Sequence, residues 1–266
     1  MPRFRTVEVY PMSGGWDQPW IKGDADADAF AKVSRGICDL YSGHLAEADL
    51  RNPVSTLRIF VGAEADNAPP ASEDGRAGVL SPTWTGRPQG FEQAAVRVPA
   101  GFAFWELARQ QRVVLDAVHA AARGVADLRG LDRTAFEQAR ETVEAAAFTF
   151  TWTGPWKVSP GRRWRARCTF RTMPDGFGRL VVQVAGPQDE SPFASSSEQV
   201  AWTTAEGYRR AAKTLRWASP RRLEVIPSVG LHDVVGGTFV AELGASSEHP
   251  ELHDVELPPP LGRSGT

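Results

Sequence analysis

Reactive and metal-binding residues are scarce in this chain of 266 residues. It has two cysteines, Cys38 and Cys168, and five histidines. The two cysteines lie far apart and form no CxxC pair, which argues against a redox motif and against a cysteine-rich zinc site. Both fall at apolar positions of predicted elements. We therefore expect two buried thiols and a reducing compartment.

Motifs of several enzyme classes are missing. No GxSxG element of serine hydrolases occurs, and no GxGxxG or Walker sequence follows the first predicted strand. The acidic residues Asp24, Asp26 and Asp28 lack the glycine and glutamate that complete a calcium loop, so we interpret them as the capped first turn of a helix. We expect no cofactor and no metal ion, and the sequence gives no positive sign of an enzyme.

The histidines offer only weak candidates for catalysis. His119 has Asp116 and Arg123 one helical turn to either side, and pairing along a helix surface explains such a triple. His232 and the neighbouring Asp233 lie in a glycine-flanked segment without further signature. Potential metal ligands also gather near the C-terminus, where they lack a rigid support: Glu248, His249, Glu251, His253 and Asp254.

Long apolar runs are missing as well. No run approaches the length of a membrane span, and the first twelve residues contain no apolar core of a signal peptide. We therefore expect a cytoplasmic protein without membrane contact. Arginine far outnumbers lysine and alanine is abundant, which indicates a bacterial genome rich in G and C.

Positive charge is concentrated in the middle of the chain, although the net charge is only −2. Residues 155–225 carry 13 Lys and Arg against 6 Asp and Glu, while both flanking segments are acidic. The whole molecule therefore has no general attraction to nucleic acid. The basic middle segment indicates either a partner site or charge compensation within the protein.

The densest mixture of charged and aromatic side chains lies between Phe148 and Gly186. A two-residue alternation there predicts three antiparallel strands with an apolar face and a face of arginine and threonine. These arginines either pair with carboxylates elsewhere in the protein or form a platform for an anion or an acidic partner. The candidate anion-binding or partner-binding residues are Lys157, Arg163, Arg165, Arg167, Arg171 and Arg179.

Apolar spacing along the rest of the chain predicts an α+β fold. We expect helices near residues 25–44, 102–128, 134–147 and 198–217, and strands near 3–10, 55–62, 94–98, 221–226 and 238–243. The two middle helices are expected to form a hairpin on the apolar face of the three-stranded meander. Residues 1–244 form either one α+β domain or two halves with a seam near 63–90, followed by a flexible acidic, proline-rich tail at 245–266.

These observations favour a non-catalytic cytosolic binding protein that acts through protein–protein contact, as an inhibitor, an immunity-type protein or an accessory factor. Trp16 and Trp20 in a glycine- and proline-rich loop form a candidate interaction loop, although such residues also fold back onto a core.

The alternative function is binding of nucleic acid or another polyphosphate by the arginine strand face. Against it, Trp164 and Phe170 point away from the arginines, so bases would not stack where phosphates bind. Trp156 and Lys157 are the exceptions that could reach the basic face. An unrecognised enzyme that uses His119 or His232 is the third hypothesis.

Overall fold

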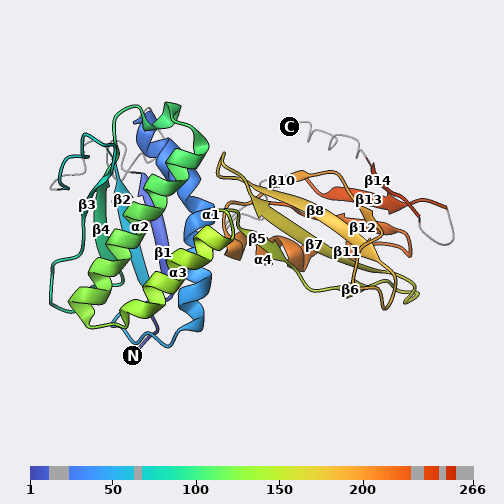
Figure 1. Cartoon of the computed structure of the whole chain (residues 1–266). Coiled ribbons are helices and arrows are strands. Elements are labelled where there is room, and N and C mark those ends of the chain that lie inside the picture. Colours follow the sequence, from blue (N-terminus) through green and yellow to red (C-terminus); the bar gives the residue numbers. More distant parts are fainter. Residues whose placement is uncertain (12–23, 63–67, 229–236, 246–249, 256–266) are drawn as a thin grey trace, which may run out of the picture. The chain divides into compact units, whose positions relative to one another are not determined.

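A computed structural model describes residues 1–11, 24–62, 68–228, 237–245 and 250–255 of the chain. The α+β class predicted from the sequence is confirmed, with strands and helices arranged as Figure 1 shows. The chain divides into two compact units, one comprising residues 1–150 with 172–176 and the other residues 151–171 with 177–266. Residues 68–90, the described part of the stretch that the sequence suggests as a seam, belong to the first of these units.

The first unit contains a four-stranded mixed sheet in the order β1-β2-β4-β3. Three strands are parallel and the short edge strand β3 runs antiparallel to β4. The bounds are β1 (Thr6–Pro11), β2 (Thr56–Val61), β3 (Gly78–Leu80) and β4 (Glu92–Arg97). Helix α1 (Ala25–Glu47) connects the parallel strands β1 and β2, as the predicted strand–helix–strand unit requires.

Helix α1 begins at the acidic run, as the sequence predicts. The Asp24 carboxylate accepts hydrogen bonds from the backbone N–H groups of Asp26 and Ala27, at 3.0 and 3.1 Å. The Asp26 carboxylate in turn accepts from the N–H groups of Gly101 and Ala103. Asp24 and Asp26 therefore serve as backbone caps, while Asp28 forms an ion pair with Lys32 at 2.6 Å.

Helices α2 (Leu107–Arg129) and α3 (Arg133–Ala145) form the predicted hairpin, but its expected packing on the meander is wrong. Both helices join α1 on one face of the sheet of the first unit (Figure 1). Apolar stripes of all three helices share a single core with the inward side chains of β1, β2 and β4, among them Val7, Leu57, Ile59, Ala94 and Val96. The two-residue period of the strands and the 3.6-residue period of the helices predict which face of each element is apolar. They do not predict which helix packs on which sheet.

Helix α2 begins later than residue 102, where the sequence predicts its start. Gly101 adopts a positive φ of 76°, which glycine tolerates without strain, and a short 3₁₀ turn η1 (Phe102–Phe104) follows. The backbone at Trp105 and Glu106 is then extended, so the α-helix begins only at Leu107.

The second unit contains the predicted meander. Its sheet has the order β10-β8-β7-β5, with β6 beside β7 and β9 beside β8. The bounds are β5 (Thr151–Thr153), β6 (Lys157–Val158), β7 (Arg165–Thr172), β8 (Gly178–Ala185), β9 (Ala194–Ser195) and β10 (Gln199–Ala201). Strand β5 starts later than predicted because Ala147 and Phe148 have positive φ values of 47° and 58°.

Helix α4 (Ala205–Thr214) is shorter than the predicted helix at 198–217. Ser196 does not cap it, because its hydroxyl accepts the backbone N–H of Val182 at 3.0 Å. Residues 199–201 instead pair with β8, and Thr204 caps α4 by accepting the N–H of Gly207 at 3.2 Å. The ladder bonds with β8 therefore replace the first predicted helical turns.

A third, antiparallel sheet has the order β11-β12-β13-β14. Its bounds are β11 (Arg216–Trp217), β12 (Arg222–Val225), β13 (Phe239–Leu243) and β14 (Leu252–Val255). The strands predicted near 221–226 and 238–243 are β12 and β13. Strand β14 pairs with β13 and lies within the stretch expected as a tail.

A buried ion pair joins β4 to α2 in the first unit. The Arg129 guanidinium lies 2.8 Å from one Glu92 carboxylate oxygen and 3.1 Å from the other, and both side chains are at least nine-tenths buried. Asn52 donates to the same carboxylate at 3.4 Å. Because buried charges depend on their partners, loss of one member leaves the other uncompensated.

We predict that Arg129→Ala lowers the free energy of unfolding of the first unit by about 3–5 kcal/mol. Arg133→Ala is the matched control, because Arg133 pairs with Asp127 on an exposed surface and should cost less than about 1 kcal/mol. Urea unfolding of both variants measures the difference. Equal effects would contradict the burial of the Glu92 carboxylate.

Candidate functional site

Strand β7 carries the arginine face predicted from the sequence. Ala166, Cys168 and Phe170 are buried on one side of the strand, while Arg165 and Arg167 are half-buried on the other. The alternation follows from the two-residue period of a strand. The apolar side is covered by α4, whose Tyr208 ring stacks on Phe170 with a centroid distance of 4.7 Å.

Trp156 lies directly beside these arginines. Strand β6 pairs Lys157 with Ala166, and the same register places Trp156 across from Arg167, on the arginine face. The guanidinium carbons of Arg165 and Arg167 lie 4.6 and 4.3 Å from the centroid of the Trp156 ring. One indole therefore holds two guanidinium groups by cation–π stacking.

The hydrogen bonds of the two arginines go to neutral groups. Arg167 donates from Nε to the Gln183 side-chain oxygen at 2.9 Å, and Thr169 donates to the same oxygen at 3.1 Å. Arg165 donates to the backbone carbonyl of Asp189, and its Nε is buried without a hydrogen-bond partner. Among the described residues neither arginine has a carboxylate within ion-pair distance. We call Trp156, Arg165 and Arg167 the arginine–tryptophan cluster.

The other candidate residues are placed differently. Arg171 forms an ion pair with Glu198 at 3.0 Å, so its charge is compensated. Arg179 donates to the backbone carbonyls of Phe177 and Gly178 at 3.5 and 3.3 Å. The guanidinium of Arg163 lies 4.9 Å from the ring of its neighbour Trp164. Trp16 and Trp20 lie outside the described residues.

Lys157 does not join the arginines. Its ammonium group donates to the carbonyl oxygens of Lys213 and Leu215, at 2.8 and 2.6 Å, and so caps the C-terminal end of α4. Burial lowers the pKa of Lys157 below its ordinary value. Since α4 packs on the apolar side of the meander, its own basic residues do not extend the arginine face.

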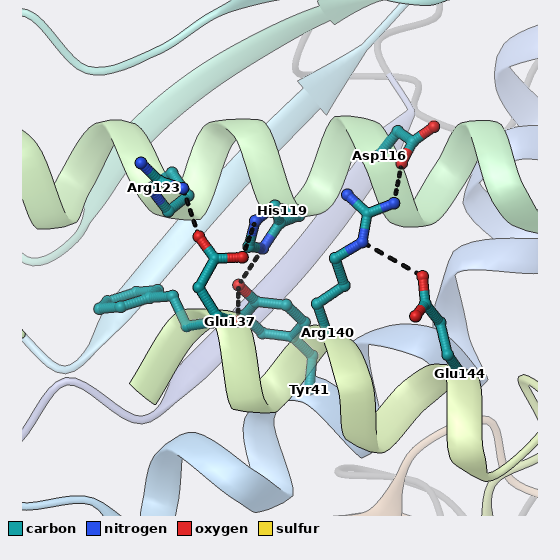
Figure 2. A network of polar contacts seen from close by, with 8 residues as sticks. Tyr41, Asp116, His119, Arg123, Glu137, Arg140 and Glu144 are labelled. Atoms are coloured by element: carbon teal, nitrogen blue, oxygen red, sulfur yellow. Dashed lines mark hydrogen bonds and ion pairs between the residues drawn. The ribbon is translucent and has the colours of Figure 1, made fainter. Parts of the chain in front are cut away.

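A second polar cluster lies in the first unit, between α1, α2 and α3 (Figure 2). His119 approaches the Tyr41 hydroxyl with Nδ1 at 3.0 Å and the Glu137 carboxylate with Nε2 at 3.2 Å. Arg123 pairs with Glu137 as well. Nearby, Arg140 bridges Asp116 and Glu144 at 2.7 and 3.2 Å. The predicted pairing of His119 with Asp116 along one helix is therefore wrong: its partners come from α1 and α3.

Proton positions in this histidine network follow from its charges. Desolvation by burial lowers the pKa of His119, which favours a neutral ring. Because the Glu137 carboxylate only accepts, Nε2 carries the proton, and Nδ1 accepts from the Tyr41 hydroxyl. The single hydroxyl proton of Tyr41 is shared between Nδ1, at 3.0 Å, and the Phe136 carbonyl oxygen, at 3.2 Å. Burial raises the pKa of Tyr41, which keeps its proton in place.

The histidine network binds α1, α2 and α3 together, and its tyrosine and histidine are closed to solvent. The Tyr41 side chain is fully buried and His119 is 7% exposed. Burial also raises the pKa of both cysteine thiols, that of Cys168 to about 12, so neither is a thiolate at neutral pH. His232 and Asp233 lie outside the described residues.

Within the described part of the chain, no group of three or more His, Cys, Asp or Glu side chains is arranged to hold a metal ion. None of the helices there is both long and apolar enough to cross a membrane. No family model matches the chain, and no match is found among curated proteins or solved structures. The argument for function therefore depends on the geometry of the arginine–tryptophan cluster.

The lowered pKa of His119 predicts a pH-dependent stability. Below the ordinary histidine pKa of 6.5 the unfolded chain binds a proton at this position more readily than the folded chain. The stabilising contribution is therefore complete above about pH 6.5 and is lost as the pH falls toward the folded-state pKa. We expect His119→Gln to flatten the decrease in unfolding free energy between about pH 7 and pH 5, measured by urea unfolding. His44→Gln, a change on α1, serves as the control, and an unchanged slope in His119→Gln would contradict the network.

Proposed function

We propose that this protein is a non-catalytic binding protein that recognises an acidic protein surface through its arginine–tryptophan cluster. One observation carries the proposal: two guanidinium groups are stacked on a single indole and have no carboxylate partner among the described residues. Guanidinium forks match the planar carboxylates of Asp and Glu. The roles compatible with such binding are those of an inhibitor, an immunity-type protein or an accessory factor in the cytoplasm.

Preorganisation supports this proposal. An arginine in water loses side-chain entropy when it binds, whereas Arg165 and Arg167 are already held by Trp156, Gln183 and the Asp189 carbonyl. A rigid cluster with an aromatic centre and arginines around it has the composition of a binding hot spot.

Nucleic acid is the less favoured partner for two reasons. The indole of Trp156 is occupied by its own arginines, so it offers no open ring on which a base could stack. Few positive charges also remain for successive phosphates, because Arg171 is paired with Glu198 and the Lys157 ammonium group binds carbonyl groups of α4. Affinity for nucleic acid needs many such contacts and falls steeply with salt.

The test compares the protein with the double variant Arg165→Glu/Arg167→Glu as bait in the lysate of the source cell. We expect a defined protein to be recovered at low and moderate salt, to resist nuclease, and to be lost with the double variant. The variant should change the free energy of unfolding by less than about 2 kcal/mol, since both side chains lie at the surface of the sheet.

Arg221→Glu provides the control, because Arg221 is exposed and lies outside the cluster. It should retain the partner. Retention of the partner by the double variant would place the binding surface elsewhere. Recovery of nucleic acid that vanishes with moderate salt would instead favour the polyphosphate alternative.

A further inference from the structure

The hairpin formed by β3 and β4 opens partway along its length. Pairing runs from Gly78 opposite Arg97 to Leu80 opposite Ala95, and then stops. The same register would place Pro82 opposite Gln93. Proline has no backbone N–H to donate to the Gln93 carbonyl, so the ladder of hydrogen bonds between β3 and β4 does not continue to Pro82.

The backbone of Gln93 faces the opened side of the hairpin. The Val96 carbonyl accepts a hydrogen bond from Gly62, just beyond β2, at 3.2 Å, so Val96 points its N–H and C=O toward the β2 side. Because these groups alternate in direction along a strand, Ala95 and Gln93 point them toward β3. Ala95 meets Leu80, whereas no strand of the described chain lies opposite Gln93.

A pocket of about 480 Å³ lies at this opening. Its volume falls in the range of about 300–1,000 Å³ that is usual for ligand sites. Both sides of the open hairpin line it, and the lining includes Ser81, Thr83, Trp84, Gln89, Phe91 and Gln93.

The segment that follows β3 forms the wall of the pocket opposite β4, and contacts with α2 hold this segment away from β4. The Ser81 hydroxyl donates to the carbonyl of Ala120 at 3.3 Å, and Gly124 lets this contact form because a Cβ there would meet Ser81 at 2.3 Å. Further along, the Arg129 guanidinium donates to the carbonyls of Trp84, at 3.1 Å, and Gly86, at 2.9 Å. The opening therefore exists before any ligand binds.

The residues that line the pocket are almost all uncharged. Its one ionisable group, the Glu92 carboxylate, is buried and neutralised by Arg129. Trp84 is 61% exposed and offers an open aromatic surface. Phe91, another lining residue, is stacked by the Arg58 guanidinium at 4.3 Å, whose charge is paired with Glu8. These properties suit an uncharged ligand whose own backbone N–H and C=O groups can bind the backbone of Gln93.

We propose that this groove binds a short, extended, uncharged peptide segment of a partner protein, which lies beside β4 and takes the position that β3 leaves. The peptide backbone donates to the Gln93 carbonyl and accepts from the Gln93 N–H, and a side chain of the peptide packs on Trp84. Strand addition of this kind takes its affinity from main-chain hydrogen bonds. The site is independent of the arginine–tryptophan cluster.

The experiment titrates the full chain with acetyl-Val-Thr-Val-amide and follows backbone amide resonances by NMR. We expect saturable shifts centred on Gln93 and Trp84. The same peptide methylated on its backbone nitrogens keeps its side chains but loses its donors, and its binding should be at least about tenfold weaker. Equal binding of the two peptides, or no saturable shift at Gln93, would overturn the proposal.

Two variants complete the test. Trp84→Ala removes an exposed side chain and should weaken peptide binding severalfold while the rest of the spectrum stays unchanged. Tyr10→Ala removes another exposed aromatic of the same sheet, outside the pocket, and should bind as the original chain does. Equal binding by both variants would contradict the assigned groove.

Discussion

The two-residue alternation along β7 is the constraint on which the second unit depends. It buries Ala166, Cys168 and Phe170 beneath α4 and places Arg165 and Arg167 on the opposite side. A slip of one residue in register would bury the arginines and expose the core. The position of Trp156 depends on the same register, because β6 pairs with β7. The arginine–tryptophan cluster is thus a consequence of how the sheet buries its apolar side.

The arginine–tryptophan cluster differs from the ion pairs that stabilise the packing of the first unit. In the first unit, Arg129 is paired with Glu92 and Arg123 with Glu137, so these guanidinium groups stabilise the packing of helices on each other and on the sheet. In the second unit, Arg165 and Arg167 contact an aromatic ring and neutral acceptors. An ordered positive charge without a carboxylate partner favours an acidic partner. The Arg109 guanidinium also stacks on an indole, that of Trp105, at 3.7 Å. Among the described residues Trp156 alone carries two guanidinium groups, which is why we locate recognition there.

Local patterns in the sequence were sufficient for much of the fold. The alternation from Phe148 to Gly186 predicted the meander, and the acidic run at Asp24 predicted the start of α1. Packing between distant elements was not predictable in this way. The apolar stripe of the hairpin formed by α2 and α3 does not specify which sheet it covers. The core of the first unit shows that it covers β1, β2 and β4.

The candidate site could likewise be predicted from the sequence only in part. The arginine face followed from the period of β7, and Trp156 was identified as a residue that could reach it. The sequence groups Lys157 with the arginines, because it cannot reveal that Lys157 caps carbonyl groups of α4 more than 50 residues away. The partners of His119 were missed for the same reason, since Tyr41 is 78 positions away and interhelical contacts leave no local signature.

The most direct test of the central claim is an NMR measurement of the Arg167 side-chain Nε–H resonance. Stacking over the Trp156 ring should shift this resonance upfield through the ring current, and Trp156→Leu should return it to the position of an exposed arginine. Addition of the acidic partner should move the resonance in the original chain. A resonance at the exposed position in the original chain, unchanged by Trp156→Leu, would contradict the cluster and the function built on it.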